Sequence, residues 1–360
     1  MDTPASDRFV VQSHTGPYEV EFARGAISRI AGTVPAKSHF FVDANVARLY
    51  AKDLHHVVES SSVMVIEATE ANKSLERFPE YVEHLVSQGV RRGQVLIAIG
   101  GGITQDIVCF LAATVLRGIP WWFYPTTLLA QADSCIGSKS SINVGRAKNI
   151  VGTFTPPRRV IIDPAMRETL NEVDVRSGYG EMLKVHAIDG PDAFDRIAAD
   201  YPRLGEPTVL THYIRRSLEI KRNLIEQDEF DQGPRNVMNY GHTFGHALES
   251  ATDFRIPHGI AISIGADMAN HVAVTIGRMD IAHYRRMHPV LRANFSGFER
   301  EPVGLDAFMQ AIAKDKKNSN DTLTLILPDD HARIGLVRYP NDARFREICR
   351  QYLEDRRSWL

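Results

Sequence analysis

Short continuous apolar runs alternate with segments of helical periodicity over roughly the first 165 residues. We expect strands at residues 9–12, 18–22, in the run that ends at Asp43, and at 63–67, 95–99, 121–127 and 158–163. Helices are expected after the second and third of these strands, up to about Leu85, and from Asp106 to near Gly118. Buried parallel strands read as continuous apolar runs, so the pattern predicts a parallel sheet with helices on both faces.

The pattern changes near residues 164–175, where we place a domain boundary. From Thr169 to Lys314 the periodicity is mostly helical and candidate strands disappear. A polar segment, DKKNSND, then precedes a short apolar run, LTLILP, and a helix expected around Arg344–Asp355. The predicted fold is an α/β N-terminal domain, residues 1–168, followed by a mainly α-helical C-terminal domain, residues 169–360.

The length, net charge and cysteine content narrow the class of protein. A chain of 360 residues exceeds the usual size of one hydrophobic core, and a net charge of −2 gives no sign of a nucleic-acid or membrane partner. Three scattered cysteines suit a reducing compartment. The N-terminus lacks a signal-peptide pattern, and no apolar run reaches the length of about 18 residues that a membrane span needs. We therefore expect a cytoplasmic protein.

Histidines concentrate between Arg235 and Gly259, in the stretch RNVMNYGHTFGHALESATDFRIPHG. His242 and His246 are four residues apart, so on a helix they share a face, with Arg235 and Asn239 about two turns and one turn upstream. Spacing alone therefore favours these two histidines as a metal pair, with zinc as the natural ion. A single histidine would more often be structural.

Three glycines, Gly100 to Gly102, stand between a predicted strand and a predicted helix. Glycines let the backbone approach a phosphate, and a helix N-terminus favours negative charge, so this segment could bind a nucleotide phosphate. A plain tight turn is the alternative interpretation. Asp43, at an earlier strand end, could hold ribose hydroxyls or simply belong to a turn.

The segment 125–149 combines hydroxyls, amides and cations among small residues, which suits an anionic, hydroxylated ligand, although a solvated loop has the same composition. Spacing alone makes Glu181 and Lys184 an ordinary ion pair on one helix face. Lys221 and Arg222 likewise read as part of a charged, solvated helix face.

Taken together, the motifs GGGITQD, LRG, PTTLLAQADS, IGSKSSIN, KNIVGTF, GEMLK, EIK and RNVMNYGHTFGHALE resemble the dehydroquinate synthase family, and more broadly the sugar phosphate cyclases. The resemblance runs from about Asp43 to Lys317. It implies an NAD-binding, Rossmann-like N-terminal domain, a helical C-terminal domain that binds metal and substrate, and an active site between them. It also implies a homodimer that uses NAD and a divalent metal, zinc or cobalt.

The resemblance assigns roles residue by residue. As metal ligands it implies Glu181, His242 and His258. As NAD-binding residues it implies Asp43, Asn45, Glu70, Lys73, Gly101, Gly102, Asp106, Thr126, Thr127 and Thr169. As substrate-binding residues it implies Arg117, Asp133, Lys139, Lys148, Asn149, Lys184, Lys221, Arg235, Asn239, His246 and Lys316, with Arg117 reaching a neighbouring subunit and Lys317 as the alternative to Lys316. Among these it implies catalytic roles for Lys139, Lys184, Lys221, Asn239 and His246.

The implied reaction oxidises a substrate alcohol transiently, eliminates phosphate, returns the hydride and closes a carbocycle by an intramolecular aldol step. The retained Arg235, Asn239 and His246 favour 3-deoxy-D-arabino-heptulosonate 7-phosphate, which gives 3-dehydroquinate in aromatic amino-acid synthesis. Departures beside the expected ligands, among them Gln105 and Ile260, leave a specialised cyclase of sedoheptulose 7-phosphate or glucose 6-phosphate open. A metal-dependent polyol dehydrogenase of the glycerol dehydrogenase type and a non-catalytic binding protein are weaker alternatives.

Overall fold

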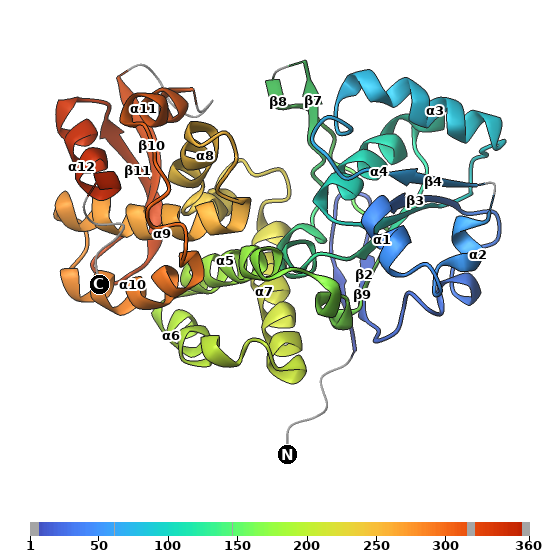
Figure 1. Cartoon of the computed structure of the whole chain (residues 1–360), viewed down its shortest axis with the longest axis horizontal. Helices are drawn as coiled ribbons and strands as arrows, with labels where there is room; N and C mark the ends of the chain where they lie inside the picture. Colours follow the sequence, from blue (N-terminus) through green and yellow to red (C-terminus); the bar gives the residue numbers. More distant parts are fainter. Residues whose placement is uncertain (1–6, 61, 146, 315–320, 355–360) are drawn as a thin grey trace. The chain divides into compact units, whose positions relative to one another are not determined.

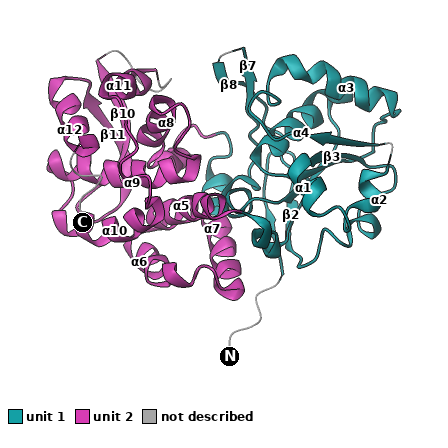
Figure 2. Cartoon of the chain, in the orientation of Figure 1, with its two compact units in different colours: residues 1–170, 221–230 teal, residues 171–220, 231–360 magenta. Residues whose placement is uncertain are grey.

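The computed structural model describes residues 7–60, 62–145, 147–314 and 321–354. The chain separates into two compact units (Figure 2). The first unit comprises residues 1–170 and 221–230, and the second comprises residues 171–220 and 231–360. Helix α7, Pro207–Gln227, contributes residues to both units.

A seven-stranded sheet in the order β1-β2-β9-β6-β5-β3-β4 forms the centre of the first unit (Figure 1). Its strands are β1 (Arg8–Val11), β2 (Tyr18–Phe22), β3 (His39–Asp43), β4 (Val63–Ile66), β5 (Leu96–Gly100), β6 (Trp121–Pro125) and β9 (Arg159–Ile162). All neighbouring strands pair in parallel except β1, which is antiparallel to β2. The predicted parallel sheet is therefore confirmed.

Both faces of this sheet are covered, because alternate residues of each strand point to opposite sides. On one face Phe40 and Val42 pack in a core cluster with residues of α1 (Ala44–Leu49) and α2 (His55–Val58). On the other face the Phe41 ring meets the Tyr81 ring of α3 (Phe78–Ser87) edge to face, 6.4 Å between centroids. The Phe78 ring in turn contacts the Phe110 ring of α4 (Gly102–Thr114), so α3 and α4 cover this second face.

Several local elements differ from the sequence prediction. Helix α4 begins at Gly102, not at Asp106, so the glycine run supplies a strand end, an N-cap and a first helical residue. The helix expected after β2 is only a short 3₁₀ turn, Ile30–Gly32. The predicted loop at 125–149 contains a π-helical turn, Ala130–Ser134, and runs into an antiparallel hairpin of β7 (Ile142–Val144) and β8 (Ala147–Val151). Strand β8 is almost wholly exposed and therefore carried no alternating apolar signal.

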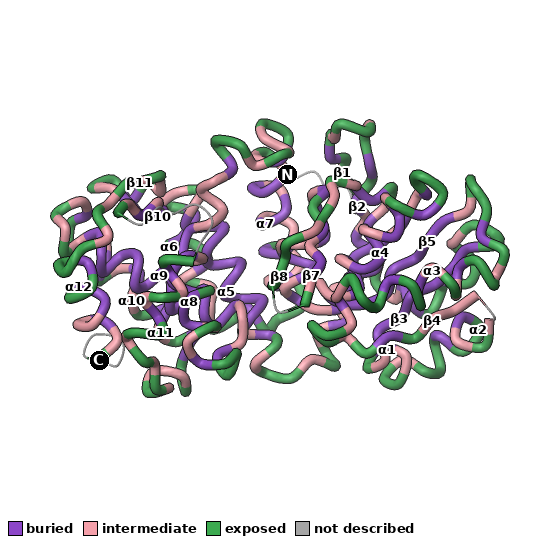
Figure 3. Tube along the Cα trace, turned by 90° about the horizontal axis from the view of Figure 1, so that it is seen from above, coloured by how far each residue is buried: buried purple, intermediate pink, exposed green. Residues whose placement is uncertain are grey.

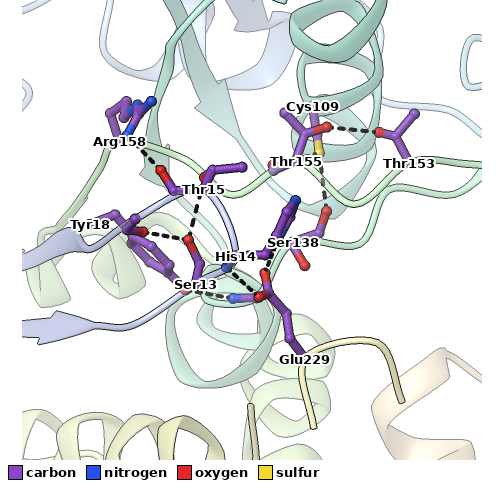
Figure 4. Close-up of polar contacts among 12 residues, drawn as sticks. Ser13, His14, Thr15, Tyr18, Cys109, Ser138, Thr153, Thr155, Arg158 and Glu229 are labelled. Carbon is purple, nitrogen blue, oxygen red and sulfur yellow. Dashed lines mark hydrogen bonds and ion pairs between the residues drawn. The ribbon is translucent and has the colours of Figure 1, made fainter. Parts of the chain in front are cut away.

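The second unit is mainly helical and is built around α9, His258–Thr275. Every residue of α9 from Gly259 to Ala273 is buried, as the tube in Figure 3 shows. The helices in contact with it are α5 (Glu172–Asp189), α8 (His242–Ala251), α10 (Ile281–Phe295) and α12 (Ala343–Glu354). The unit also contains α6 (Pro191–Asp200) and α11 (Leu305–Ala313).

The apolar run LTLILP is strand β10, Thr322–Pro328, and it pairs in antiparallel register with β11, Ile334–Pro340, which the sequence pattern did not predict. Half of β11 is exposed, so its apolar periodicity is weak. Among the described residues no helix combines the length and the apolar character needed to cross a bilayer. Cys109, Cys135 and Cys349 are buried free thiols.

Candidate metal, cofactor and substrate sites

The histidine stretch is not one continuous helix. Pro234–Asn239 forms a 3₁₀ segment, Gly241 then takes a left-handed conformation with φ +77°, and α8 begins at His242. The prediction that Asn239 and Arg235 lie one and two turns upstream on the helix of His242 is therefore wrong. Glycine tolerates this conformation, and the kink places His242 at a helix N-terminus.

Side chains from three helices converge around one buried carboxylate. Oε1 of Glu181, on α5, lies 3.3 Å from Nε2 of His258, the first residue of α9, and 3.7 Å from Nε2 of His242, the first residue of α8. The ligand-type nitrogens of His242, His246 and His258 all lie within 4.8 Å of one another. One carboxylate and up to three imidazoles therefore face a common point, which is a donor set that zinc and similar divalent cations prefer.

The second nitrogen of two of these rings is already engaged. Nδ1 of His242 is 3.3 Å from the carbonyl oxygen of Tyr240, and Nδ1 of His258 is 3.2 Å from Oε2 of Glu249. A ring that donates its Nδ1 hydrogen presents an unprotonated Nε2, and in both rings Nε2 is the atom that faces Glu181. Backbone and carboxylate partners thus orient His242 and His258 as metal-binding histidines are oriented.

The close packing of charges and the burial shift the pKa of each donor in the cluster. Burial alone would raise the pKa of Glu181, but Lys184, whose Nζ lies 2.5 Å from Oε2, and the histidines hold it well below its ordinary value. Burial and the Lys184 charge lower the pKa of His242 well below its ordinary value. Burial opposes protonation of His258 as well, but hydrogen bonds to Glu181 and Glu249 raise its pKa to about 10.

Close helix crossings at glycines bring these side chains together. A Cβ on Gly259 would lie 1.9 Å from the carbonyl oxygen of Ser177, and a Cβ on Gly180 would lie 2.1 Å from that of Gly259. Helices α5 and α9 therefore touch backbone to backbone beside Glu181 and His258. A Cβ on Gly265 would likewise lie 2.1 Å from the carbonyl oxygen of Gly241, where α9 passes the start of α8.

Glu249 offers a graded test of this arrangement. We expect Glu249→Ala to weaken binding of zinc or cobalt by about 10–100-fold, the usual cost of removing the partner of a ligating histidine. His258 would keep its position on α9 but lose the carboxylate that orients its ring. Competition with a chelating dye measures the affinity. Glu206→Ala, at an exposed glutamate of the same unit that pairs with Arg203, should leave it unchanged. Equal affinities in all three proteins would contradict the orienting role.

The remaining predicted residues of the second unit are placed as follows. Lys184 is buried beside Glu181, and Arg235 is also buried. Asn239 is half-buried and donates to the carbonyl oxygen of Asn236, while His246 is exposed on α8. Lys316, and Lys317 with it, lies outside the described residues.

In the first unit, the N-terminus of α4 has the features of a phosphate site. Gly101 caps the helix without any side-chain hydrogen bond to the first-turn amides. A Cβ on Gly102 would meet nothing within 4 Å, whereas a Cβ on Gly101 would lie 2.9 Å from Cγ2 of Thr127. Thr126 follows the end of β6, and its amide donates to the carbonyl oxygen of Gly100. The glycines, Thr126 and Thr127 thus lie together at the carboxyl ends of β5 and β6, where open parallel sheets bind ligands.

A polar network surrounds the buried Lys73. Its Nζ lies 3.1 Å from Oδ2 of Asp106 and 3.1 Å from Oδ1 of Asn149. Burial raises the pKa of Asp106 to about 6, although Lys73 beside it acts in the opposite direction. Glu70 is 3.9 Å from Lys73 and accepts from Nδ2 of Asn143, a residue that the sequence reading did not select. Glu70, Lys73, Asp106 and Asn149, four predicted residues from three segments of the chain, therefore meet in the first unit.

Other predicted cofactor residues have local partners. Oδ1 of Asp43 accepts from the amides of Asn45 and Val46 and so caps α1. Asn45 accepts from Arg48. The hydroxyl of Thr169 lies 3.1 Å from that of Tyr50. The structure therefore places Asp43 and Asn45 at the start of α1 and Thr169 beside Tyr50.

Asp133 and Lys221 form a tight pair. Nζ of Lys221 lies 2.7 Å from Oδ1 of Asp133 and donates to its carbonyl oxygen at 2.7 Å. Asp133 lies in the π-helical turn, a geometry that recurs at functional sites, and Lys221 is buried. The reading of Lys221 as part of a solvated face, from spacing alone, is therefore wrong.

The other predicted cations of the first unit are exposed. Lys139 follows the π-helical turn and forms an isolated antiparallel β-bridge with Phe154 through its backbone, and Lys148 lies on β8. Arg117 has φ +66° and follows Leu116, which also has positive φ. Two consecutive left-handed residues other than glycine are costly, and such strain concentrates at functional positions.

Two family models match the chain. The model for the 3-dehydroquinate synthase N-terminal domain matches residues 63–177, and the model for the C-terminal domain matches residues 178–318. The 3-dehydroquinate synthase of Thermoanaerobacter sp. (strain X514) is 32% identical over 332 residues, which is 89% of this chain and 93% of the relative. That of Streptococcus gordonii (strain Challis) is 33% identical and covers 90% of this chain and 94% of the relative.

Solved structures share the fold. A 2-deoxy-scyllo-inosose synthase in complex with carbaglucose-6-phosphate, NAD⁺ and Co²⁺ superposes with a TM-score of 0.82 at 21% identity, over 96% of this chain and 99% of that one. The 2-epi-5-epi-valiolone synthase of Streptomyces hygroscopicus subsp. jinggangensis 5008, solved with NAD⁺ and Zn²⁺, gives 0.80 at 27% identity, over 94% and 97%. An iron-containing alcohol dehydrogenase gives 0.63 at 14% identity, over 96% and 98%.

Proposed function

Because the chain belongs to the 3-dehydroquinate synthase family, we propose that it is an NAD- and metal-dependent sugar phosphate cyclase that converts 3-deoxy-D-arabino-heptulosonate 7-phosphate into 3-dehydroquinate and phosphate. The observation that carries the proposal is the cluster of His242 and His258 around the buried Glu181, with the buried Lys184 beside it. NAD supplies a reversible hydride acceptor when bound, and the divalent cation supplies Lewis acidity at the alcohol to be oxidised.

The residues present fit a divalent metal. Nε2 of His242 and Nε2 of His258 both face Oε1 of Glu181, and both Nδ1 atoms have other partners. Lys184 and the histidines hold the pKa of Glu181 well below its ordinary value, which favours the ionised carboxylate that a cation binds. We propose Glu181, His242 and His258 as the ligands and zinc or cobalt as the ion. His246, exposed on the same helix face as His242, would bind substrate.

The first unit fits a dinucleotide. The N-terminus of α4, with its glycines, can accept a pyrophosphate, because its N-cap Gly101 has no side chain to occupy the first-turn amides and the helix dipole favours negative charge. Thr126 and Thr127 flank it. We propose that Lys73, Glu70 and Asp106, which form the network around Lys73, also bind the dinucleotide. We propose the same role for Asp43, Asn45 and Thr169.

The cations fit a phosphorylated, anionic substrate. Lys184 and Lys221 are both buried, and each is held by a carboxylate within 2.7 Å. An ammonium carries three hydrogen-bond donors, and its charge strengthens the hydrogen bonds that it donates to the oxygens of an anionic substrate. We propose that Lys184 and Lys221, together with Lys139, Asn149, Asn239 and Arg235, orient the sugar and its phosphate, with Lys148 and Lys316 adding charge.

A second candidate is a cyclase of a substrate without a carboxylate, such as sedoheptulose 7-phosphate. The 27% identity to the 2-epi-5-epi-valiolone synthase, over nearly the whole of both chains, supports this second candidate function. We place it second because relatives above 30% identity include the 3-dehydroquinate synthases of Thermoanaerobacter sp. and Streptococcus gordonii.

The reaction class is tested by phosphate release with catalytic amounts of NAD and added zinc or cobalt. We expect 3-deoxy-D-arabino-heptulosonate 7-phosphate to release stoichiometric phosphate without net NADH, because the hydride returns to the substrate. The product mass should equal that of 3-dehydroquinate. Phosphate release only from sedoheptulose 7-phosphate or glucose 6-phosphate would select another cyclase. Steady NADH accumulation without phosphate would indicate a polyol dehydrogenase.

Arg235 tests the carboxylate in the substrate. We expect Arg235→Ala to lower kcat/KM for the carboxylated heptulosonate by about 10–100-fold, the loss of a charge-assisted hydrogen bond. Sedoheptulose 7-phosphate has no carboxylate, so its residual turnover should change far less. Steady-state kinetics on both substrates gives the ratio. Equal losses on the two substrates would reject a carboxylate-binding role for Arg235.

Assembly and location belong to the same proposal. We propose a homodimer in the cytoplasm, in which Arg117 reaches the site of the neighbouring subunit. The exposure of Arg117 and its strained backbone support this role.

A further inference from the structure

Gln105 and Ser134 exchange two hydrogen bonds in the first unit. Nε2 of Gln105 donates to the carbonyl oxygen of Ser134 at 2.6 Å, and Oγ of Ser134 donates back to Oε1 of Gln105 at 2.7 Å. Gln105 is buried, so both ends of its amide are held away from water. A reciprocal pair of this kind fixes the distance and the rotation between two elements better than a single hydrogen bond does.

The two partners belong to two different predicted sites. Gln105 lies in the first turn of α4, where its backbone N–H donates to the carbonyl oxygen of Gly101 at 3.0 Å. This turn is the proposed position of the dinucleotide phosphates. Ser134 is the last residue of the π-helical turn and directly follows Asp133, which holds Lys221 through its carboxylate and its carbonyl oxygen. Any displacement of the first turn of α4 is therefore passed to the turn that carries Asp133.

The other end of the π-helical turn is anchored to the sheet. Nε2 of Gln131 donates to the carbonyl oxygens of Pro125, at the end of β6, and Asp163, just after β9, at 3.0 and 2.8 Å. The turn is thus tied to the sheet at Gln131 and to the cofactor helix at Ser134. Asp133 lies between these two attachments, so its position depends on both.

We propose that Gln105 and Ser134 are a positioning pair that couples dinucleotide binding at the N-terminus of α4 to sugar phosphate binding at Asp133 and Lys221. The inference rests on the proposed function. Neither residue needs to touch a ligand. When a phosphate orders the first turn of α4, the reciprocal hydrogen bonds hold Asp133 and Lys221 in the arrangement that receives the substrate, and by linkage the substrate tightens the dinucleotide equally.

The test measures the coupling itself. The Kd of NAD is determined by calorimetry on the zinc-loaded protein, alone and with a saturating phosphonate analogue of the heptulosonate, in which a methylene replaces the ester oxygen. We expect the analogue to tighten NAD by about fivefold or more in the wild-type protein. In Gln105→Ala the ratio of the two Kd values should fall to within about twofold of unity. Ser134→Ala, which loses one of the two hydrogen bonds, should be intermediate, and Ser134→Thr, which retains the hydroxyl, should keep the wild-type ratio.

Gln88→Ala is the matched control. Gln88 is the C-cap residue of α3 in the same unit, and its side-chain amide makes a long hydrogen bond, 3.5 Å, to the hydroxyl of Ser87. Its coupling ratio should equal that of the wild type. A wild-type ratio in Gln105→Ala, or a ratio of one in the wild type, would overturn the coupling while leaving the proposed function intact. A wild-type protein that binds neither NAD nor the analogue would overturn the proposed function, and this inference with it.

Discussion

His258→Ala should bind zinc or cobalt at least about 100-fold more weakly than the wild type and lose measurable turnover. Removing a ligand costs more than the 10–100-fold that removing the partner of a ligand costs. Nε2 of His258 lies 3.3 Å from Oε1 of Glu181, closer than Nε2 of His242 at 3.7 Å. The substitution therefore removes one of the three proposed metal ligands. Metal content after gel filtration and chelator competition measure the effect.

The control for this variant is His331→Ala, at an exposed histidine in the turn between β10 and β11 of the same unit. It should retain wild-type metal content and activity. Thermal unfolding of metal-free His258→Ala should remain cooperative, because the ring is partly exposed and its loss opens no large cavity. Full metal occupancy in a folded His258→Ala protein would refute its assignment as a ligand.

Gly259→Ala should destabilise the protein by at least about 3 kcal/mol, the upper end of the cost of overpacking. The added methyl would lie 1.9 Å from a backbone oxygen of Ser177, and backbone cannot rotate aside as a side chain can. Helix α9 would have to move away from α5, which would separate Glu181 from His258. We therefore expect a lower midpoint in urea unfolding and a loss of metal binding in whatever protein folds.

Gly335→Ala gives the matched comparison. Gly335 lies on β11 in the same unit, and a Cβ there would meet nothing within 4 Å. Its effect on the free energy of unfolding should stay within about 1 kcal/mol, and alanine there could even stabilise by restricting the unfolded chain. Similar unfolding midpoints for the two variants would show that the crossing of α5 and α9 is looser than the distance at Gly259 implies.

Much of the first unit could be predicted from local patterns. The runs that end at Asp43 and at Gly100 are buried strands, and continuous apolar runs are the usual mark of a parallel sheet. The glycine run after β5 was expected beside a helix N-terminus, and α4 begins within it. The family, too, followed from motifs in the sequence, and the family models confirm it.

Local patterns failed where exposure removed the signal or where a special backbone conformation intervened. No residue of β8 or β11 is buried, so no buried apolar face could mark these strands. The reading of Arg235 through His246 as one helix assumed a continuous 3.6-residue period, whereas Gly241 at φ +77° interrupts it. Lys221 was indistinguishable from a solvated lysine until its contact with Asp133, 88 residues away, was seen.

The sequence by itself determined the parallel strands of the first unit, the family, and which residue types are available for chemistry. Only the tertiary structure decided which of them meet: Glu181 with His242 and His258, Lys73 with Asp106 and Asn149, and Gln105 with Ser134. The physical reason is that periodicity reports which face of an element is buried. It does not report where two elements cross, and here the crossings depend on glycines at which α5, α8 and α9 touch backbone to backbone.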